Sequence, residues 1–351
     1  MTPIRPQRVA RIPRDQQPLL LVVIDTEEEF DWGAPHDRNS RSVDCIGEQH
    51  HAQAVFARHQ IVPTYVVDHP VATTPASAAI FRRWVEDGSC IVGAHLHPWV
   101  NPPDREEVNA RNSYPGNLPM DLEREKLAVL TEAIAGNIGR RPDIYKAGRY
   151  GLGPNSARVL LDLGYEIDLS VVPGTDFGAD GGPDFRGLPH DPFWFGPEGR
   201  LFEIPLSRGF PGLLGAYGES VYNLIGGRTG QSLKLPGVMS RLKLVERIAL
   251  TPEGVSLDDC KRVTEHLFAQ GRRVFTLAYH SSSLLPGGSP YVKTLEGRQR
   301  FLDKMDGYIA WFREKLGGRG ATPYEIRALC GGPAVTSPAR SRIPAPDIQG
   351  S

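Results

Sequence analysis

The sequence has few cysteines and almost no net charge, and each of these absences disfavours a class of protein. It contains four cysteines and no CxxC pair, so neither a zinc ribbon nor a disulfide scaffold is indicated, and a reducing compartment fits best. Lys and Arg number 40 against 41 Asp and Glu, a formal net charge of −1. A nearly neutral chain has no broad field that attracts a nucleic acid, so we expect no nucleic-acid partner.

Long apolar runs are also missing. The longest one near the start, Pro18–Ile24, is too short to cross a bilayer. Arg8, Arg11 and Arg14 precede it, but no small-residue cleavage site follows it. We therefore expect no membrane span and no signal peptide, and predict a cytoplasmic protein.

The 351 residues favour one large domain between two tails. Residues 1–17 are rich in Arg, Pro and Gln without any period, which predicts a flexible N-terminal arm. Residues 18–330 form the expected domain, and 331–351 read as a flexible C-terminal tail. The oligomeric state is left open.

Within the domain, buried strands alternate with helices. Continuous apolar runs predict strands at Pro18–Asp25, Ile61–Val67, Cys90–His95 and Arg273–His280, with further strands at 143–148 and 165–172. Helices are expected at about 46–59, after Thr74, and at 120–136, 154–163 and 257–270. This alternation is typical of a parallel α/β sheet or barrel. The long loops 98–119 and 173–200 are the expected walls of a cleft.

Titratable residues gather where these strands end, which is the catalytic face of parallel α/β folds. Asp25 and Glu27 are spaced i, i+2, so both face one side of an extended chain, as do His95 and His97. Two imidazoles and a carboxylate are the ligands of catalytic zinc and of non-haem iron. The second acid, Asp25 or Glu27, is then free to act as a general base, although a capping role for Asp25 is the alternative. We interpret Glu28 and Glu29 as a solvated helix start.

These pieces, in this order, resemble the polysaccharide deacetylases of carbohydrate esterase family 4. The motifs are IDTEEEFDW at residues 24–32, VGAHLHPW at 92–99 and LAYH at 277–280. The resemblance implies a distorted parallel (β/α) barrel, a divalent metal, expected to be zinc, and removal of the N-acetyl, or another N-acyl, group of an amino sugar in a surface polysaccharide or its precursor. Within this family, the sequence is similar to the branch associated with lipopolysaccharide and surface-polysaccharide biosynthesis.

The resemblance also implies roles for single residues. Asp25 is the expected base, Glu27, His95 and His97 are the expected metal ligands, and His280 is the expected acid. The family spaces its two histidines i, i+4, which would put a ligand at Trp99, whereas this chain offers His97 at i+2.

The family's third and fourth motifs have weaker counterparts. The segment YKAGRYG offers either Lys146 or Arg149 to orient the base, and we favour Arg149 because its planar fork grips a carboxylate at two places. Asp168 is expected to set His280, with a structural Asp as the alternative. The candidate substrate contacts are Trp32, Trp99, Tyr114 and Lys146.

Two further hypotheses compete with a sugar deacetylase. One is a hydrolase of an amide that is not part of a sugar, using the same residues. The other is a binding or scaffold protein on the same fold that has lost activity, which the atypical second and third motifs favour. A serine hydrolase using Ser281–Ser283 is disfavoured because no GxSxG motif occurs.

Overall fold

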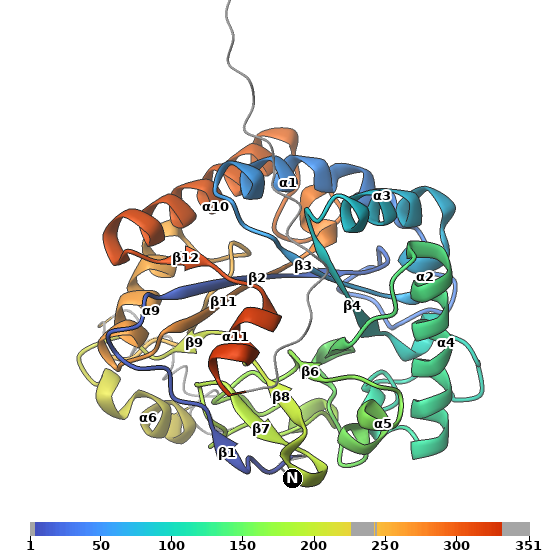
Figure 1. The fold of residues 1–351 in the computed structure, drawn as a ribbon, viewed down its shortest axis with the longest axis horizontal. Helices are drawn as coiled ribbons and strands as arrows, with labels where there is room; N and C mark the ends of the chain where they lie inside the picture. Colours follow the sequence, from blue (N-terminus) through green and yellow to red (C-terminus); the bar gives the residue numbers. More distant parts are fainter. Residues whose placement is uncertain (1–3, 226–241, 243, 332–351) are drawn as a thin grey trace, which may run out of the picture.

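The strands form one large, mostly parallel sheet surrounded by helices (Figure 1). The computed structural model describes residues 4–225, 242 and 244–331. The strands are β1 (Arg8–Val9), β2 (Leu19–Thr26), β3 (Thr64–Val67), β4 (Ile91–Leu96), β5 (Ile144–Ala147), β6 (Ile167–Asp168), β7 (Phe193–Phe195), β8 (Leu201–Glu203), β9 (Arg208–Gly209), β10 (Ile248–Ala249), β11 (Val274–His280) and β12 (Arg319–Gly320).

The sheet has the order β1-β7-β8-β6-β5-β4-β3-β2-β11, with β12 added beside the start of β2. Every pair from β8 to β11 along this order is parallel, whereas β1, β7 and β8 pair antiparallel. The expected parallel (β/α) barrel is confirmed, and its distortion is an opening between the two ends of the sheet. The separate pair β9 and β10 lies between β11 and the chain that follows β6: Leu206 N, just before β9, donates to Val171 O, and Ala278 N of β11 donates to Leu250 O, just after β10.

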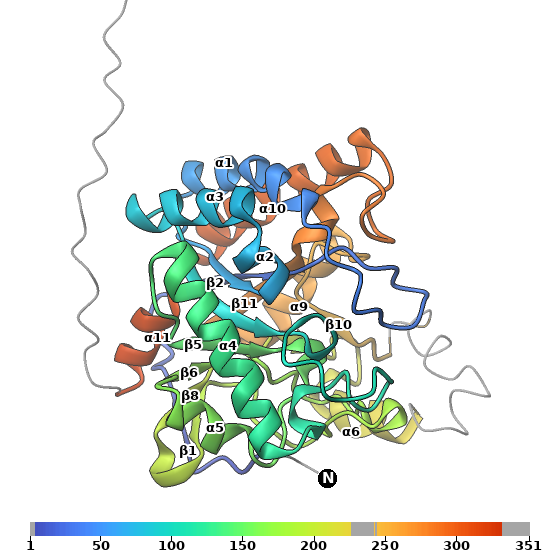
Figure 2. The same ribbon diagram turned by 90° about the vertical axis from the view of Figure 1, so that its right-hand side faces the viewer.

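Helices cover the outside of the sheet. Helices α1, α3 and α10 lie together on one side of the molecule, and α4 runs along another side (Figures 1 and 2). The helices are α1 (Gln49–Arg58), α2 (His69–Thr73), α3 (Pro75–Glu86), α4 (Met120–Ile138), α5 (Ser156–Asp162), α6 (Gly218–Ile225), α9 (Leu257–Ala269), α10 (Leu295–Leu316) and α11 (Pro323–Leu329).

The N-terminal segment is more ordered than its composition suggests. Residues 8–9 form β1, which pairs with β7, and the side chains of Ile4 and Ala10 are buried. The expected flexible arm therefore contributes an edge strand to the sheet, held by backbone hydrogen bonds from Gln7 N to Trp194 O and from Ala10 N to Pro192 O and by the burial of Ile4 and Ala10. The expected tail, apart from residue 331, lies outside the described residues.

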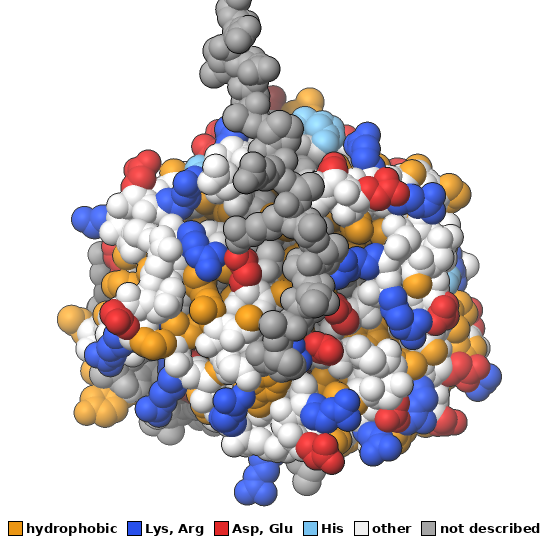
Figure 3. Space-filling model, viewed as in Figure 1, with side chains coloured by type: hydrophobic (Ala, Val, Ile, Leu, Met, Phe, Trp, Pro, Cys, Tyr) orange, Lys and Arg blue, Asp and Glu red, His pale blue; other side chains and the backbone are white. Residues whose placement is uncertain are grey.

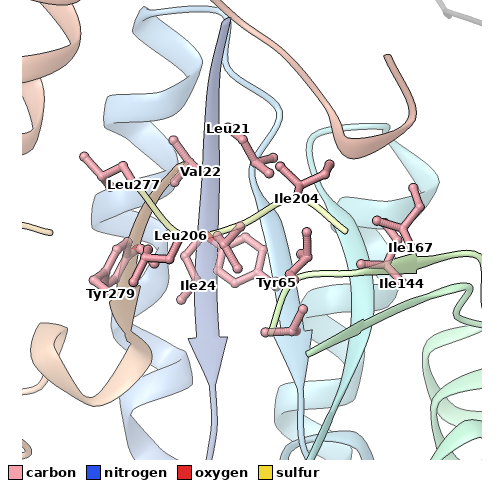
Figure 4. Close-up of a cluster of buried hydrophobic side chains, with 14 of the residues drawn as sticks. Leu21, Val22, Ile24, Tyr65, Ile144, Ile167, Ile204, Leu206, Leu277 and Tyr279 are labelled. Carbon is pink, nitrogen blue, oxygen red and sulfur yellow. The ribbon is translucent and has the colours of Figure 1, made fainter. Parts of the chain in front are cut away.

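The core lies inside the barrel and between the sheet and its helices. All eight residues of β2 are buried, as its continuous apolar run predicts for a strand covered on both faces. Figure 4 shows side chains of several strands converging in this core: Leu21, Val22, Ile24, Tyr65, Ile144, Ile167, Ile204, Leu206, Leu277 and Tyr279. Packing on both faces fixes the positions at which the strands end.

Charged side chains of both signs are interspersed on the surface shown in Figure 3. Among the described residues, no helix combines the length and the apolarity that crossing a membrane requires. The four cysteines are all buried as free thiols.

Candidate active site

The sheet register brings the predicted site residues to one edge. Asp25 is paired with His280 across β2 and β11, and His95 is paired with Lys146 across β4 and β5. These positions lie at or near the carboxyl ends of parallel strands, where the fold places its ligand-binding crevice.

Glu27, His95 and His97 form a buried group that could hold a metal ion. Their ligand atoms lie within 4.8 Å of one another, and all three side chains are buried. Glu27 Oε2 is 3.4 Å from His95 Nε2 and 3.3 Å from His97 Nε2. The i, i+2 spacing thus does bring both imidazoles to one carboxylate.

Hydrogen bonds on the far side of each ring select the form that binds a metal. His95 Nδ1 donates to the backbone oxygen of Lys146 at 2.9 Å, and His97 Nδ1 donates to Glu28 Oε2 at 2.8 Å. A neutral imidazole with its proton on Nδ1 keeps the lone pair of Nε2 free. Both free lone pairs are therefore on the side of Glu27.

The donor set fits a divalent cation of the zinc type. Glu27 Oε1 is buried and has no hydrogen-bond partner among the described residues, although buried carboxylate oxygens are normally satisfied. Burial raises the pKa of Glu27, but the charge of the neighbouring His280 opposes burial, and the net shift of that pKa is downward, which favours the ionised carboxylate. One carboxylate and two imidazole nitrogens leave a position open for water or substrate, as in catalytic zinc sites.

Glu28 is a site residue that the sequence analysis missed. We expected a solvated helix start, but Glu28 is fully buried and accepts from both His97 Nδ1 and Trp99 Nε1, the latter at 2.7 Å. Its backbone N–H donates to Asp68 Oδ2 at 2.8 Å. Burial raises the pKa of Glu28 to about 8, whereas donation from Trp99 Nε1 favours its ionised form, the form that accepts from His97 Nδ1. The period-2 alternation of an extended chain could have signalled that Glu28 faces away from Glu27, toward the neighbouring strand β3 and its end.

Lys146, rather than Arg149, contacts the predicted base. Lys146 Nζ lies 2.5 Å from Asp25 Oδ1 and 2.6 Å from Oδ2, and both side chains are buried. Burial raises the pKa of Asp25, but Lys146, His95 and His280 outweigh it and hold that pKa below its usual range. For Lys146, burial lowers the pKa, and the stronger combined attraction of Asp25, Tyr150 and Glu27 raises it.

Arg149 faces elsewhere because the chain turns sharply after β5. Arg149 and Tyr150 have φ angles of 55° and 60°, in the left-handed region that side chains rarely adopt. The guanidinium of Arg149 lies over the ring of Tyr114, 4.2 Å from its centroid, and donates to Ser113 Oγ at 2.5 Å. The prediction that Arg149 orients Asp25 was therefore wrong, because Lys146 on β5 contacts the Asp25 carboxylate and Arg149 contacts Ser113 instead.

Glu253, rather than Asp168, sets the orientation of His280. Glu253 accepts from His280 Nδ1 at 2.8 Å and from the backbone N–H of His280 at 3.0 Å. His280 Nε2 then faces Asp25 Oδ2 at 3.7 Å. Burial lowers the pKa of His280, but Glu253, Glu27 and Asp25 outweigh it and raise that pKa well above its usual value. The shift favours the protonated form of the imidazole.

Asp168 has a structural environment instead. It lies on β6, fully buried, and accepts from Ser170 Oγ at 2.6 Å. Its register partner on β8 is Glu203. Burial raises the pKa of Asp168. No contact joins it to His280 among the described residues, because β6 lies across the sheet from β11.

The three predicted aromatic contacts differ in exposure. Trp99 and Tyr114 are buried, and Trp99 stacks on His97 with ring centroids 4.2 Å apart. They anchor loops and are not available to a sugar. Trp32 is half-buried, its ring 4.8 Å edge-on from His280 and 5.8 Å from Tyr291, which is 46% exposed. Trp32 therefore stays a candidate contact, and the sequence analysis missed Tyr291.

Comparison with known proteins gives matches at the level of structure only. No protein-family model and no curated protein matches the sequence. A polysaccharide deacetylase, so described, from Mycobacterium smegmatis matches at 14% identity and a TM-score of 0.49, over 87% of this chain and 88% of that one.

Two further solved structures belong by name to carbohydrate esterase family 4. An acetyl xylan esterase from Clostridium thermocellum, in complex with a cobalt ion, matches at 11% identity and a TM-score of 0.43, covering 90% of this chain and 93% of its own. A pseudoenzyme from Bacillus anthracis matches at 9% identity and a TM-score of 0.42, covering 89% and 66%. The family that the sequence motifs resemble is thus named among the matching structures.

Proposed function

We propose that this protein is a metal-dependent hydrolase that removes the N-acetyl, or another N-acyl, group of an amino sugar. The substrate would be lipopolysaccharide or another surface polysaccharide, or a precursor of one. The observation that carries this proposal is one cluster of side chains, all buried except the partly exposed His280. Glu27, His95 and His97 form a ligand set, and beside it Asp25 faces a protonated His280 at 3.7 Å.

The residues of this chain divide the chemistry between them. Glu27 and the Nε2 atoms of His95 and His97 would hold a divalent cation, with zinc favoured by the donor set. When bound, such a cation polarises a carbonyl oxygen and lowers the pKa of water. Glu28 keeps His97 in the required tautomer through its bond to Nδ1.

Asp25 and His280 would move the protons of amide hydrolysis. Asp25 accepts a proton from the attacking water, whose oxygen forms a bond to the acyl carbon. His280 donates its proton to the sugar nitrogen as the carbon–nitrogen bond breaks. The products are a carboxylic acid and an amine. Lys146 holds the Asp25 carboxylate, which faces His280, and Glu253 favours the protonated form of His280.

The test is release of acetate from N-acetylated glycans. The protein is stripped with a chelator, reloaded with zinc or cobalt, and incubated with N-acetylglucosamine oligomers and with surface glycans that contain N-acetylated amino sugars. We expect acetate release by the reloaded protein and none by the stripped protein. A protein that binds zinc and yet releases acetate from none of these substrates would overturn the proposal in favour of an inactive binding protein.

A further inference from the structure

The ribbon of β9 and β10 places two arginines on one face. Arg208 lies opposite Ala249, and the pairing continues outward through the bond from Glu246 N to Pro211 O. Arg247 is two residues before Ala249, so it leaves the ribbon on the same face as Arg208. Diagonal neighbours of this kind lie about 7–8 Å apart, which is within reach of two long side chains.

Neither arginine has a carboxylate partner among the described residues. Arg208 donates to the hydroxyl of Thr175, and its buried Nε has no acceptor. The Arg247 guanidinium lies over the ring of Tyr222, 4.8 Å from its centroid. Burial, followed by the charge of Arg247, lowers the pKa of Arg208 to about 10. Two neighbouring cations without a counter-charge are unfavourable, and an anionic ligand relieves this cost.

The carboxylates nearest in sequence have partners of their own. Glu246, beside Arg247, pairs with Arg262. Glu219, on the first turn of α6, lies 3.4 Å from the Nε2 atom of His190.

The two arginines are connected to the candidate active site from both sides. Thr175 is two residues from Phe177, whose ring stacks on Tyr150 at 5.5 Å, and Lys146 Nζ lies 5.1 Å from the centre of the Tyr150 ring. On the other side, the chain leaving β10 reaches Glu253, which holds His280. A ligand group on the arginines would therefore lie beside the candidate active site that contains Asp25 and His280.

We propose that Arg208 and Arg247 form a subsite for a phosphoryl group of the substrate. Two planar guanidinium forks and a neighbouring hydroxyl suit a phosphate or diphosphate group, which offers three or more terminal oxygens, better than a carboxylate with two. The inference rests on the proposed function and makes it more specific: the substrate is an N-acyl amino sugar that carries a phosphate or a diphosphate.

Binding of inorganic phosphate, measured by calorimetry on the zinc-loaded protein, tests the subsite directly. Arg247→Gln is the main variant because Arg247 is exposed and its loss leaves the core intact. We expect phosphate affinity to fall at least tenfold in this variant. Arg262→Gln is the matched control, since Arg262 already pairs with Glu246 and should not bind phosphate.

Two further measurements test whether phosphate binds at the metal site instead and whether the subsite prefers phosphate to another anion. Glu27→Ala, which removes a metal ligand, should keep the phosphate affinity. Loss of affinity in Glu27→Ala but not in Arg247→Gln would place phosphate on the metal and overturn the subsite. Acetate at the same ionic strength should bind at least tenfold more weakly than phosphate. Equal affinity for the two anions would overturn the assignment to a phosphoryl group.

Kinetics distinguish failure of the subsite from failure of the proposed function. With N-acetylglucosamine 1-phosphate and a nucleoside diphosphate N-acetylglucosamine as the two phosphate sources, Arg247→Gln should raise KM about tenfold with kcat unchanged. With a neutral oligomer it should change neither constant. Equal effects on neutral and phosphorylated substrates would reject the subsite while deacetylation stands. Phosphate binding that depends on Arg247, without deacetylation of any amino sugar, would reject the proposed function alone.

Discussion

Lys146 holds both carboxylate oxygens of Asp25, at 2.5 and 2.6 Å, in a buried pair. An ammonium group between two carboxylate oxygens fixes the direction of the side chain and keeps the carboxylate ionised. Asp25 can therefore accept a proton without first having to lose one. The cost is a weaker base, which the lowered pKa of Asp25 expresses.

Replacing Lys146 tests this relationship. Lys146→Met should leave Asp25 buried without a cation, raise its pKa and reduce deacetylation at neutral pH by about 10²-fold or more, the scale of a lost acid–base contribution. Acetate release and bound zinc are measured on the same sample. Arg149→Met is the control and should keep most of the activity. The reverse pattern would restore Arg149 as the residue that orients the base.

Metal occupancy separates ligands from the base. Glu27→Ala, His95→Ala and His97→Ala should each lower the zinc content measured by elemental analysis, because each removes one donor of the buried group. Asp25→Asn should keep most of the zinc and abolish acetate release, because an amide cannot accept the proton. If Asp25→Asn empties the site and Glu27→Gln leaves it full, the two roles are exchanged.

Glu28 should act on the metal through His97. Glu28→Ala leaves His97 Nδ1 and Trp99 Nε1 without their acceptor, so the ring loses its fixed tautomer and orientation. Loss of such a partner typically costs 10–100-fold in metal affinity. Zinc dissociation constants from competition with a chelator provide the measurement, and Glu29→Ala is the neighbouring control. An unchanged zinc affinity in Glu28→Ala would show that Glu28 does not act on the metal site and contributes only to packing.

The sequence was sufficient to predict six strands, β2, β3, β4, β5, β6 and β11, and several of the site residues near their ends, but not the short strands β1, β7, β8, β9, β10 and β12. A run such as Pro18–Asp25 predicts a strand covered on both faces, and parallel strands share one catalytic edge, so Asp25, Glu27, His95 and His280 could be grouped without a structure. The opening of the barrel could not be predicted in this way. It depends on pairing of short segments such as β9 and β10, two residues each, which have no pattern of their own.

Partners of the site residues were harder to predict, because they depend on register and on loops. Lys146 and Arg149 are three residues apart, and only the left-handed turn at Arg149 decides which one reaches Asp25. Glu253 approaches His280 from the short segment after β10, which no motif marks. Glu28 is buried because β2 ends inside the protein, whereas a row of three acids reads from sequence as a solvated surface.

The dependence of activity on pH should report His280. Glu253 raises the pKa of His280, and the acid must be protonated when the amine leaves, so activity should fall only as the pH rises through this raised value. Glu253→Gln removes the negative charge and should move the alkaline limb of the kcat/KM profile to lower pH. Glu219→Gln, a carboxylate that contacts His190 instead, is the control. An alkaline limb at the same pH in the wild type and Glu253→Gln would contradict this assignment.

Folding stability should follow the same group, with the sign fixed by its raised pKa. Protonated His280 stabilises the folded state fully below its unfolded pKa of about 6.5, and this contribution is lost as the pH rises through the folded value. In the wild type, the melting temperature should therefore decrease as the pH rises between the unfolded and the folded pKa of His280. His280→Ala should lack this decrease. The variant should also retain zinc and lose about 10²–10⁴-fold in turnover. Melting temperature, zinc content and turnover are measured on one preparation. A variant that melts at a lower temperature and keeps its turnover per folded molecule would make His280 a structural residue, because a general acid cannot be removed without loss of rate.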